Sequence, residues 1–287
     1  MNTKAATAKF PERIVIEMTP LCNLSCKMCP RNYIEAHKGF ITEELWMKLV
    51  DDIQSHRDDA IVLPFWRGES LLHPRFAELI RYALKRKIRI HLSTNGHVLD
   101  EANARILAEC EFVTFSIHTL QGYKNARDFL TSKKEGKPSV QVSFVKGEKS
   151  AEELLPKIVS TADLEGFDSV RLYEEHTTDG VFGKSAGSDA AARLYCQKLH
   201  DTLVISYDGS ISRCNHVWET DRTIDLRATT IHQAWTSSSI NEVRQKYPDG
   251  YCASCDQWTG HTCGESWRRE NHKITYRVYN PRGADND

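Results

Sequence analysis

The sequence predicts an α/β protein in which a partial barrel of parallel strands precedes a small cysteine-rich domain. From Arg13 to about Glu174, short apolar and β-branched runs alternate with amphipathic segments, which is typical of repeated βα units around a parallel sheet. After residue 190 this alternation is lost, and five of the nine cysteines follow. The length of 287 residues favours one large domain and a small one over a single core.

Six strands and five helices are expected to alternate in the barrel. The strands are Ile14–Met18, Ala60–Trp66, Ile88–Ser93, Phe112–Ile117, Val140–Val145 and Ser169–Tyr173. The helices are Thr42–Ser55, Pro74–Lys85, Asp100–Glu109, roughly Leu120–Ser132, and Ala151–Ala162. Thr42 suits an N-cap because Glu43 and Glu44 follow it at the positive end of the helix dipole. Six strands are too few for a closed eight-stranded barrel, so we expect a partial (β/α)6 TIM-like barrel with its functional residues in loops after the strands.

The rest of the chain is expected to be organised differently. Strands Thr202–Tyr207 and Ser210–Arg213 flank Asp208-Gly209, which indicates a hairpin, and a short helix is expected near Thr230–Lys246. Residues 175–190 are rich in Gly, Ser and Thr, which favours a linker or active-site loop. The expected parts are an N-terminal extension (1–12), the barrel (13–174), this loop (175–190), the cysteine-rich domain (191–267) and a polar tail (268–287) whose last residues, 281–287, are expected to be mobile.

Composition disfavours several classes of protein. The 38 Lys and Arg against 39 Asp and Glu give a formal charge of −1, so we expect no nucleic-acid partner and no attraction to anionic lipid. No apolar stretch reaches the roughly 18 residues of a membrane-spanning helix, and the N-terminal residues lack the apolar core of a secretory signal. We therefore expect a cytoplasmic protein whose partners bind at local sites.

Three cysteines follow the first expected strand. Thiols of a cytoplasmic protein are kept reduced, so clustered cysteines indicate metal binding or catalysis rather than disulfides. Cys22, Cys26 and Cys29 form C-x3-C-x2-C, and three thiolates this close can hold one face of a cubane iron–sulfur cluster. One iron is then left open, which indicates chemistry rather than structural support. The alternative is a zinc site or a coincidence of buried thiols, and His37 is the candidate fourth ligand.

This motif, after strand one of a partial barrel, resembles that of the radical SAM superfamily over about Arg13 to Tyr173. The resemblance implies that the three cysteines bind a [4Fe-4S] cluster whose open iron binds S-adenosylmethionine (SAM). One electron from the cluster then cleaves SAM to methionine and a 5′-deoxyadenosyl radical, so the cofactor carries the difficult chemistry. It also implies a partner that donates electrons, such as flavodoxin or ferredoxin.

Further residues match the family's SAM-binding positions in their order along the chain. The segment 66–69 resembles the Gly-Gly-Glu motif, with Arg67 in place of the first glycine. Gly68 permits close backbone approach, and Glu69 offers charged acceptors to the methionyl ammonium. The other implied cofactor contacts are Met28, near the adenine, and Ser93, Asn95 and Ser116, near the ribose or carboxylate.

Two residues near these positions have less specific expectations. His118 lies where many relatives carry an acidic residue, and it is interpreted as a substrate or cofactor contact or as a hydrogen-bonded histidine without a catalytic role. Cys110 is isolated, so we expect it to be a core thiol.

The second group of cysteines resembles the SPASM/Twitch extension of a subset of radical SAM enzymes. A full SPASM domain uses seven cysteines for two auxiliary clusters, so the five found here imply a Twitch-like domain with a single auxiliary [4Fe-4S] cluster. Its implied ligands are Cys196, Cys214, Cys252 and Cys255. A zinc ribbon is the alternative, because zinc also accepts four thiolates. Cys263 is left over, as a competing ligand or as a free thiol near the site.

The resemblance implies an enzyme with two [4Fe-4S] clusters and SAM, and two reactions fit these parts. A dehydrogenase removes hydrogen from a carbinol carbon and passes the remaining electron to the auxiliary cluster. An epimerase instead returns hydrogen from a thiol, for which Cys263 is the candidate. Arg171, on the polar face of the last barrel strand, is the candidate substrate clamp that assists proton removal. Weaker candidates are Trp66, Glu17 and Glu174.

The expected substrate is a small polar molecule. Only Met1–Glu12 precede the first strand, which leaves no room for the N-terminal peptide-recognition domain common in relatives that modify peptides. We therefore expect an oxidoreductase that dehydrogenates a sugar or aminocyclitol. The alternatives are the epimerase, a ribosomal-peptide maturase and a non-catalytic metal-binding module.

Overall fold

The structure is a computed structural model that describes residues 9–33, 38–57, 59–133, 136–175, 196–248, 250–255, 264–271 and 273–279. The chain forms two compact units. Unit 1 contains Met1–Ile90 and His176–Gly260, and unit 2 contains His91–Glu175 and His261–Asp287. Strand β3 (Arg89–Thr94) begins in unit 1 and ends in unit 2. Each unit therefore holds part of the alternating series of strands and helices.

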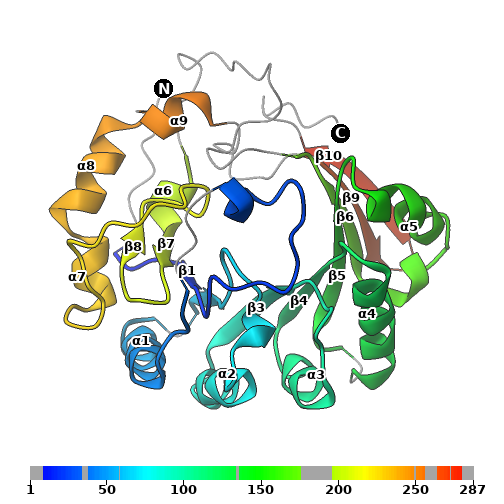
Figure 1. Cartoon of the computed structure of the whole chain (residues 1–287), viewed down its shortest axis with the longest axis horizontal. Coiled ribbons are helices and arrows are strands. Elements are labelled where there is room, and N and C mark those ends of the chain that lie inside the picture. Colours follow the sequence, from blue (N-terminus) through cyan, green and yellow to red (C-terminus); the bar gives the residue numbers. More distant parts are fainter. Residues whose placement is uncertain are drawn as a thin grey trace. The chain divides into compact units, whose positions relative to one another are not determined.

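The sheet of unit 1 is mostly parallel (Figure 1). Strand β1 (Arg13–Ile16) pairs in parallel with β2 (Ile61–Leu63) on one side and with β7 (Thr202–Ile205) on the other. Strand β8 (Ile211–Ser212) pairs antiparallel with β7, as the Asp208-Gly209 turn predicts. The expected hairpin is therefore confirmed, and its first strand also extends the sheet that begins with β1.

Helices of unit 1 are anchored by caps and by buried aromatic side chains. Helices α1 (Glu43–His56) and α2 (Phe76–Lys85) pack together, and the indole N–H of the fully buried Trp46 donates to the Leu79 carbonyl at 2.8 Å. Thr42 caps α1 as expected, because its hydroxyl accepts the Leu45 N–H at 3.2 Å. The short elements of this unit are η1 (Pro30–Tyr33), η2 (Ser70–Leu72), α6 (Lys198–Asp201) and α9 (Gly250–Ser254).

The helix expected near Thr230–Lys246 is two helices, α7 (Ile231–Trp235) and α8 (Ser238–Lys246). Thr230 and Gln233 form a capping box at the start of α7. Ser237 begins the second helix because its hydroxyl accepts the Ile240 N–H. The junction, Thr236-Ser237, contains neither Gly nor Pro, so the sequence gave no strong signal of a break.

Unit 2 contains the parallel strands β3, β4 (Phe112–Ser116), β5 (Ser139–Val145) and β6 (Ser169–Tyr173). They are connected by α3 (Glu101–Leu107), α4 (Leu120–Ser132), α5 (Lys149–Val159) and η3 (Leu164–Gly166). The ring of Phe115 on β4 packs against Phe129 of α4 at 5.4 Å, which identifies the helix-covered face of this sheet. The barrel strands and helices are thus confirmed, with bounds that differ from expectation by no more than three residues.

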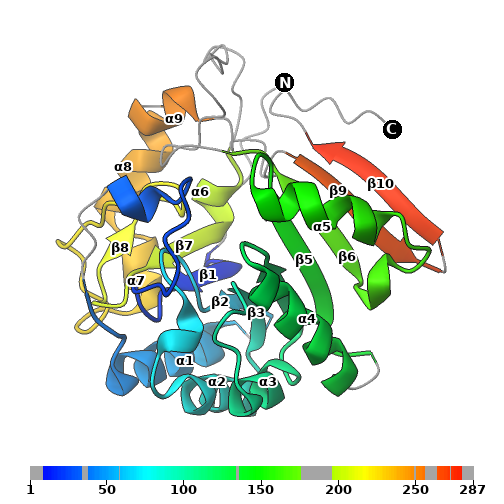
Figure 2. The ribbon, with the colours of Figure 1, turned by 45° about the vertical axis from the view of Figure 1, so that its right-hand side comes forward.

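Residues 264–279, expected to be the end of the cysteine-rich domain and the start of a polar tail, contain a β-hairpin instead. Strand β9 (Gly264–Glu270) pairs antiparallel with β6, and β10 (Lys273–Tyr279) pairs antiparallel with β9 (Figure 2). A Cβ on Gly264 would lie 1.9 Å from the Leu172 carbonyl oxygen, so only glycine fits where β9 meets β6. Charged residues dominate β9, so its sequence gives no strand signal, whereas Ile274, Tyr276 and Val278 alternate with polar residues in β10 and could have indicated that strand. Residues 281–287 lie outside the described residues, and none of the described helices is long and apolar enough to cross a membrane.

Asp168, directly before β6, connects three elements of unit 2. Its carboxylate accepts the Val140 N–H at 2.8 Å, the Lys133 ammonium at 3.1 Å and the Arg269 guanidinium at 3.1 Å. Burial acts to raise the pKa of this carboxyl, but the three donors outweigh burial and hold the pKa below its ordinary value. The ionised carboxylate therefore stabilises the unit.

Replacing Asp168 by Asn is expected to lower the free energy of unfolding at pH 7 by about 1 kcal/mol, the scale of a charged hydrogen bond that remains partly exposed. A depressed carboxyl pKa contributes stability above the unfolded value and loses it as pH falls through the folded value. The difference between the two proteins is therefore expected to shrink below about pH 4. Urea unfolding across pH 3 to 7 measures it, and a difference that does not change with pH would contradict this account.

Candidate functional site

The loop after β1 presents the first three cysteines half-buried. The Leu24 N–H donates to Cys22 Sγ at 3.5 Å, and the Cys29 N–H donates to the Cys26 carbonyl at 3.0 Å. Burial raises the pKa of Cys22 and of Cys29, and Arg31 partly opposes this effect. A metal ion displaces the proton of a thiol that it binds, so these pKa directions describe the loop without metal. Three thiols on one short loop form a donor set for an iron–sulfur cluster.

Side chains from η1 close this loop. The Arg31 guanidinium donates to the Leu24 carbonyl at 2.6 Å, and the Asn32 amide donates to the Cys26 carbonyl at 2.6 Å. Met28, the expected adenine contact, lies half-buried between the second and third cysteines. The loop conformation is thus set by contacts within the loop and its own 3-10 helix.

Gly68 and Glu69 lie against the start of the same loop. The Glu69 N–H donates to the Leu21 carbonyl at 2.7 Å. A Cβ on Gly68 would lie 2.3 Å from the carbonyl oxygens of both Thr19 and Leu21, so only glycine allows the two segments to approach this closely. Glu69 is buried, and its carboxylate accepts the Leu71 N–H at 3.1 Å. Two of the predicted cofactor residues are thus brought to the cysteine loop.

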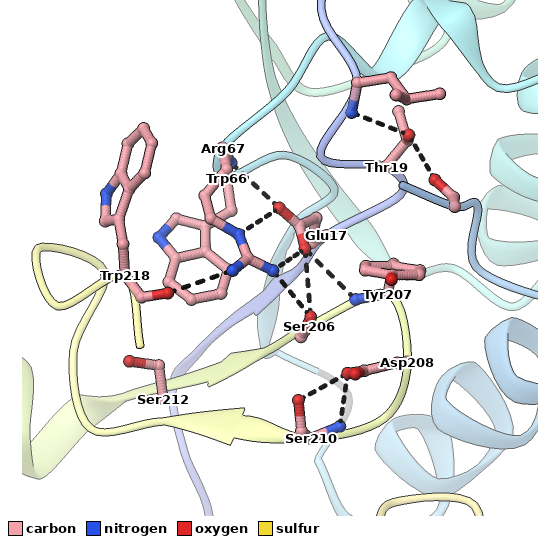
Figure 3. A network of polar contacts seen from close by, with 12 residues as sticks. Glu17, Thr19, Trp66, Arg67, Ser206, Tyr207, Asp208, Ser210, Ser212 and Trp218 are labelled. Atoms are coloured by element: carbon pink, nitrogen blue, oxygen red, sulfur yellow. Dashed lines mark hydrogen bonds and ion pairs between the residues drawn. The ribbon is translucent and has the colours of Figure 1, made fainter. Parts of the chain in front are cut away.

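Arg67, which replaces the first glycine of the family motif, lies at the centre of a buried polar network (Figure 3). Arg67 and Glu17 are 7% and 0% exposed, and their closest charged atoms are 2.5 Å apart. The guanidinium also donates to Ser206 Oγ at 2.9 Å and to the Trp218 carbonyl at 3.1 Å. Glu17, a weaker site candidate, is therefore engaged in an ion pair within the fold. The sequence did not reveal this role of Glu17, because its partner Arg67 was noticed only as a departure from the family motif.

Four of the five later cysteines line one cavity in unit 1. They are Cys196, Cys214, Cys252 and Cys255, together with Lys198, Leu199, His216, Val217, Tyr247 and Tyr251. Burial raises the pKa of Cys196 to about 12, and the neighbouring Cys214 and Cys252 act in the same direction. Four cysteines around one cavity form a donor set that suits a [4Fe-4S] cluster or zinc. The four predicted ligands are thus brought together.

Several of the singled-out residues lie outside the described part of the chain or away from both cysteine groups. Cys263, His37 and residues 176–190 lie outside the described residues. Cys110 is fully buried, its thiol donates to the Ile106 carbonyl at 3.6 Å, and burial raises its pKa to about 12. It is a core thiol, as expected.

Unit 2 holds the remaining expected cofactor contacts at the carboxyl ends of its strands. Ser93 lies in β3 and the buried Asn95 follows that strand, where its side-chain oxygen accepts the His97 N–H at 2.8 Å. Ser116 is the last residue of β4. These three residues therefore lie where βα loops begin, as the family resemblance predicts.

Ser116 takes part in a chain of hydrogen bonds. Its hydroxyl lies 3.2 Å from His118 Nε2 and 3.5 Å from the Ser143 hydroxyl. His118 Nδ1 lies 2.7 Å from a carboxylate oxygen of Glu148. His118 is thus a hydrogen-bonded histidine, which was one of the two interpretations of the sequence.

Arg171 lies on the face of the unit 2 sheet that the helices leave uncovered. Its guanidinium stacks 4.5 Å from the ring of Tyr279 and 5.0 Å from that of Tyr173. A polar cavity surrounds it, lined by Gln141, Ser169, Arg171, Ser266, Arg268, Glu270, Thr275, Arg277 and Tyr279. Sequence reasoning missed the lining residues of β9 and β10, because their segment was expected to be a tail.

Two family models match the chain. The radical SAM superfamily matches residues 16–142, and the SPASM iron–sulfur cluster-binding domain matches residues 196–256. The first range contains Cys22, Cys26 and Cys29, and the second contains the four cysteines of the unit 1 cavity. SAM and [4Fe-4S] clusters, the cofactors of these families, are therefore the cofactors of this chain.

Sequence and structure relatives agree with these matches. A tungsten-containing aldehyde ferredoxin oxidoreductase cofactor-modifying protein of Pyrococcus furiosus is 32% identical over 114 residues, which are 39% of this chain and 32% of that protein. The chain thus matches about a third of the length of this curated relative. SuiB of Streptococcus suis, solved with its precursor peptide SuiA, has a TM-score of 0.64 at 15% identity and covers 87% of this chain and 70% of that one. BtrN, solved with AdoMet and 2-DOIA, has a TM-score of 0.57 at 16% identity. The match covers 85% of this chain and 92% of the BtrN chain.

Identities this low establish the fold and leave the reaction open. They confirm the predicted fold class, an α/β partial TIM-like barrel with a C-terminal cysteine-rich domain. Residues 16–142 thus form a radical SAM domain, and residues 196–256 form an iron–sulfur cluster-binding domain of the SPASM type.

Proposed function

We propose that this radical SAM enzyme is an oxidoreductase that dehydrogenates an alcohol group of a small polar substrate, of the sugar or aminocyclitol type. The observation that carries the proposal is the four-cysteine cavity, present in the same chain as the three-cysteine loop. Four thiolates leave no iron of a [4Fe-4S] cluster open, so a cluster there suits electron transfer rather than substrate binding. Bound SAM and the first cluster supply the 5′-deoxyadenosyl radical.

The proposed oxidation removes a hydrogen atom, a proton and an electron from an alcohol and leaves a ketone. The carbinol carbon loses a hydrogen atom to the radical, the hydroxyl loses a proton to a base, and the remaining electron passes to the auxiliary cluster. A ketone is left, and one SAM is consumed for each ketone formed. The proposal thus gives each cysteine group a distinct task.

The polar cavity of unit 2 supports the proposed substrate class. Its lining includes Arg171, Arg268 and Arg277, together with Glu270, which pairs with Arg268 at 3.6 Å. A substrate with many hydroxyl groups can exchange hydrogen bonds with such a lining, whereas an apolar substrate cannot. Arg171 is the proposed substrate clamp, because Tyr173 and Tyr279 hold its guanidinium in place.

Turnover of a deuterated substrate tests the reaction class. The reconstituted enzyme, kept anaerobic, is mixed with SAM, a reductant and aminocyclitols or sugars that carry deuterium at a carbinol carbon. We expect a ketone, deuterium in 5′-deoxyadenosine and one SAM consumed per ketone. An alcohol of inverted configuration with solvent-derived hydrogen at that carbon would contradict dehydrogenation and favour the epimerase, and its loss in Cys263→Ala would then identify that thiol as the donor.

Replacing Cys22, Cys26 and Cys29 together by Ala is expected to remove one of two clusters. The iron content should fall from about eight to about four per chain, and SAM cleavage should be abolished because no open iron remains. Iron analysis and 5′-deoxyadenosine assays measure both effects. Full SAM cleavage by the triple variant would contradict the assignment of this loop.

The Glu69→Gln variant tests the proposed contact with the methionyl ammonium. The amide keeps the shape and removes the charge, so SAM binding is expected to weaken by roughly 1.5–3 kcal/mol. Titration at matched iron content measures the change. The control is Glu78→Gln, which changes an exposed carboxylate of α2 and should leave SAM affinity unchanged. Equal SAM affinity in Glu69→Gln and the wild type would show that the match to the family motif is accidental.

A further inference from the structure

Basic side chains approach the four-cysteine cavity, and no acidic side chain lines it among the described residues. Arg213 is the residue directly before Cys214, and its guanidinium donates to Cys252 Sγ at 3.4 Å. The same guanidinium lies 6.0 Å from the ring of Tyr251. Arg213 therefore connects the loop that carries one predicted ligand to the helix that carries another.

A second cation, Lys198, lines the cavity itself. Lys198 follows Cys196 by two residues, and its ammonium lies 2.8 Å from Nε2 of the buried His216. Lys198 lines the cavity together with Cys196 and the other three cysteines. Arg213 thus contacts Cys252, and Lys198 lies in the lining of the same cavity as Cys196.

The remaining lining of the cavity makes these charges effective. Leu199 and Val217 are buried, and Tyr247 and Tyr251 contribute rings. Charges act more strongly on one another beside apolar groups than in water, because the local dielectric constant is lower. Salt also screens partly buried charges less than exposed ones.

A four-thiolate cluster gains one negative charge when it is reduced. Nearby cations and donors to its sulfurs stabilise the more negative state, and the reduction potential of such clusters depends on charge, on hydrogen bonds to sulfur and on solvent exposure. A hydrogen bond from a guanidinium to a ligand sulfur combines a positive charge with a donor to sulfur. Arg213 and Lys198 therefore favour the reduced state of a cluster in this cavity.

We propose that Arg213, assisted by Lys198, raises the reduction potential of the auxiliary cluster so that it accepts the electron released by the substrate. This use rests on the proposed dehydrogenation, in which the cluster gains one electron for each ketone. An electron carrier of the flavodoxin or ferredoxin class then removes that electron. Arg213 is a positioning and tuning residue in this account and does not touch the substrate.

The midpoint potential of the auxiliary cluster tests the proposal without any substrate. Redox titration of the reconstituted full chain, followed by the EPR signal that does not respond to SAM, measures it at one pH. Arg213→Gln and Lys198→Met are expected to shift the potential downward at unchanged iron content. Arg213→Lys keeps the charge and should recover most of the shift. Arg227→Gln, at an exposed arginine paired with Asp225, is the matched control and should leave the potential unchanged.

Wild-type potentials in Arg213→Gln and Lys198→Met at full iron content would overturn the proposal. If Arg213→Gln loses auxiliary iron, Lys198→Met decides the matter, because this variant removes a cation and keeps Arg213 with its hydrogen bond to Cys252. An unchanged potential in Lys198→Met would then overturn the proposal, and a downward shift would support it. If the variants have lowered potentials but the wild-type enzyme forms no ketone, the proposed function alone is contradicted. If the wild-type enzyme forms ketone but the variants have unchanged potentials, this inference alone is contradicted.

Discussion

The buried ion pair of Glu17 and Arg67 is the contact on which the arrangement of unit 1 depends. Glu17 directly follows β1, Arg67 precedes the glycine that meets the cysteine loop, and Ser206, which follows β7, donates to the same carboxylate at 3.2 Å. The pair therefore joins segments that lie far apart in the sequence. Removal of either partner would leave a charge buried without compensation, which typically costs several kcal/mol. Gly68, which approaches Thr19 and Leu21 closely, is the residue directly after Arg67.

The segment 66–69 contacts both cysteine-bearing parts of unit 1. The indole N–H of Trp66 donates to the Asn215 carbonyl at 2.9 Å, next to Cys214, and Arg67 reaches the Trp218 carbonyl. Gly68 and Glu69 instead contact the loop that begins at Thr19. The arginine that departs from the family motif thus has a physical role, because a glycine at this position could not make the guanidinium contacts with Glu17 and Trp218. In this chain the segment that resembles the family's SAM-binding motif also supports the auxiliary domain.

Sequence patterns predicted the elements whose signals are local. The βα alternation, the Thr42 cap and the Asp208-Gly209 turn depend on neighbouring residues, and the structure contains all three. The pairing of β7 with β1 could not be predicted, because a hairpin signal does not identify what else its first strand contacts. Strand β9 was missed because charged residues dominate it, whereas the alternation of β10 was a local signal that was overlooked. The grouping of four cysteines was inferred from ligand number and family likeness, since the spacing between Cys214 and Cys252 sets no geometry by itself.

The central claim is that one chain holds an open three-cysteine cluster and a closed four-cysteine cluster. Mössbauer spectra of protein reconstituted with ⁵⁷Fe, recorded with and without SAM, test it most directly. The account predicts two [4Fe-4S] clusters, in which a single iron of about eight changes its parameters when SAM binds. About four irons per chain with zinc bound at the second cysteine group, or a response to SAM from both clusters, would contradict it.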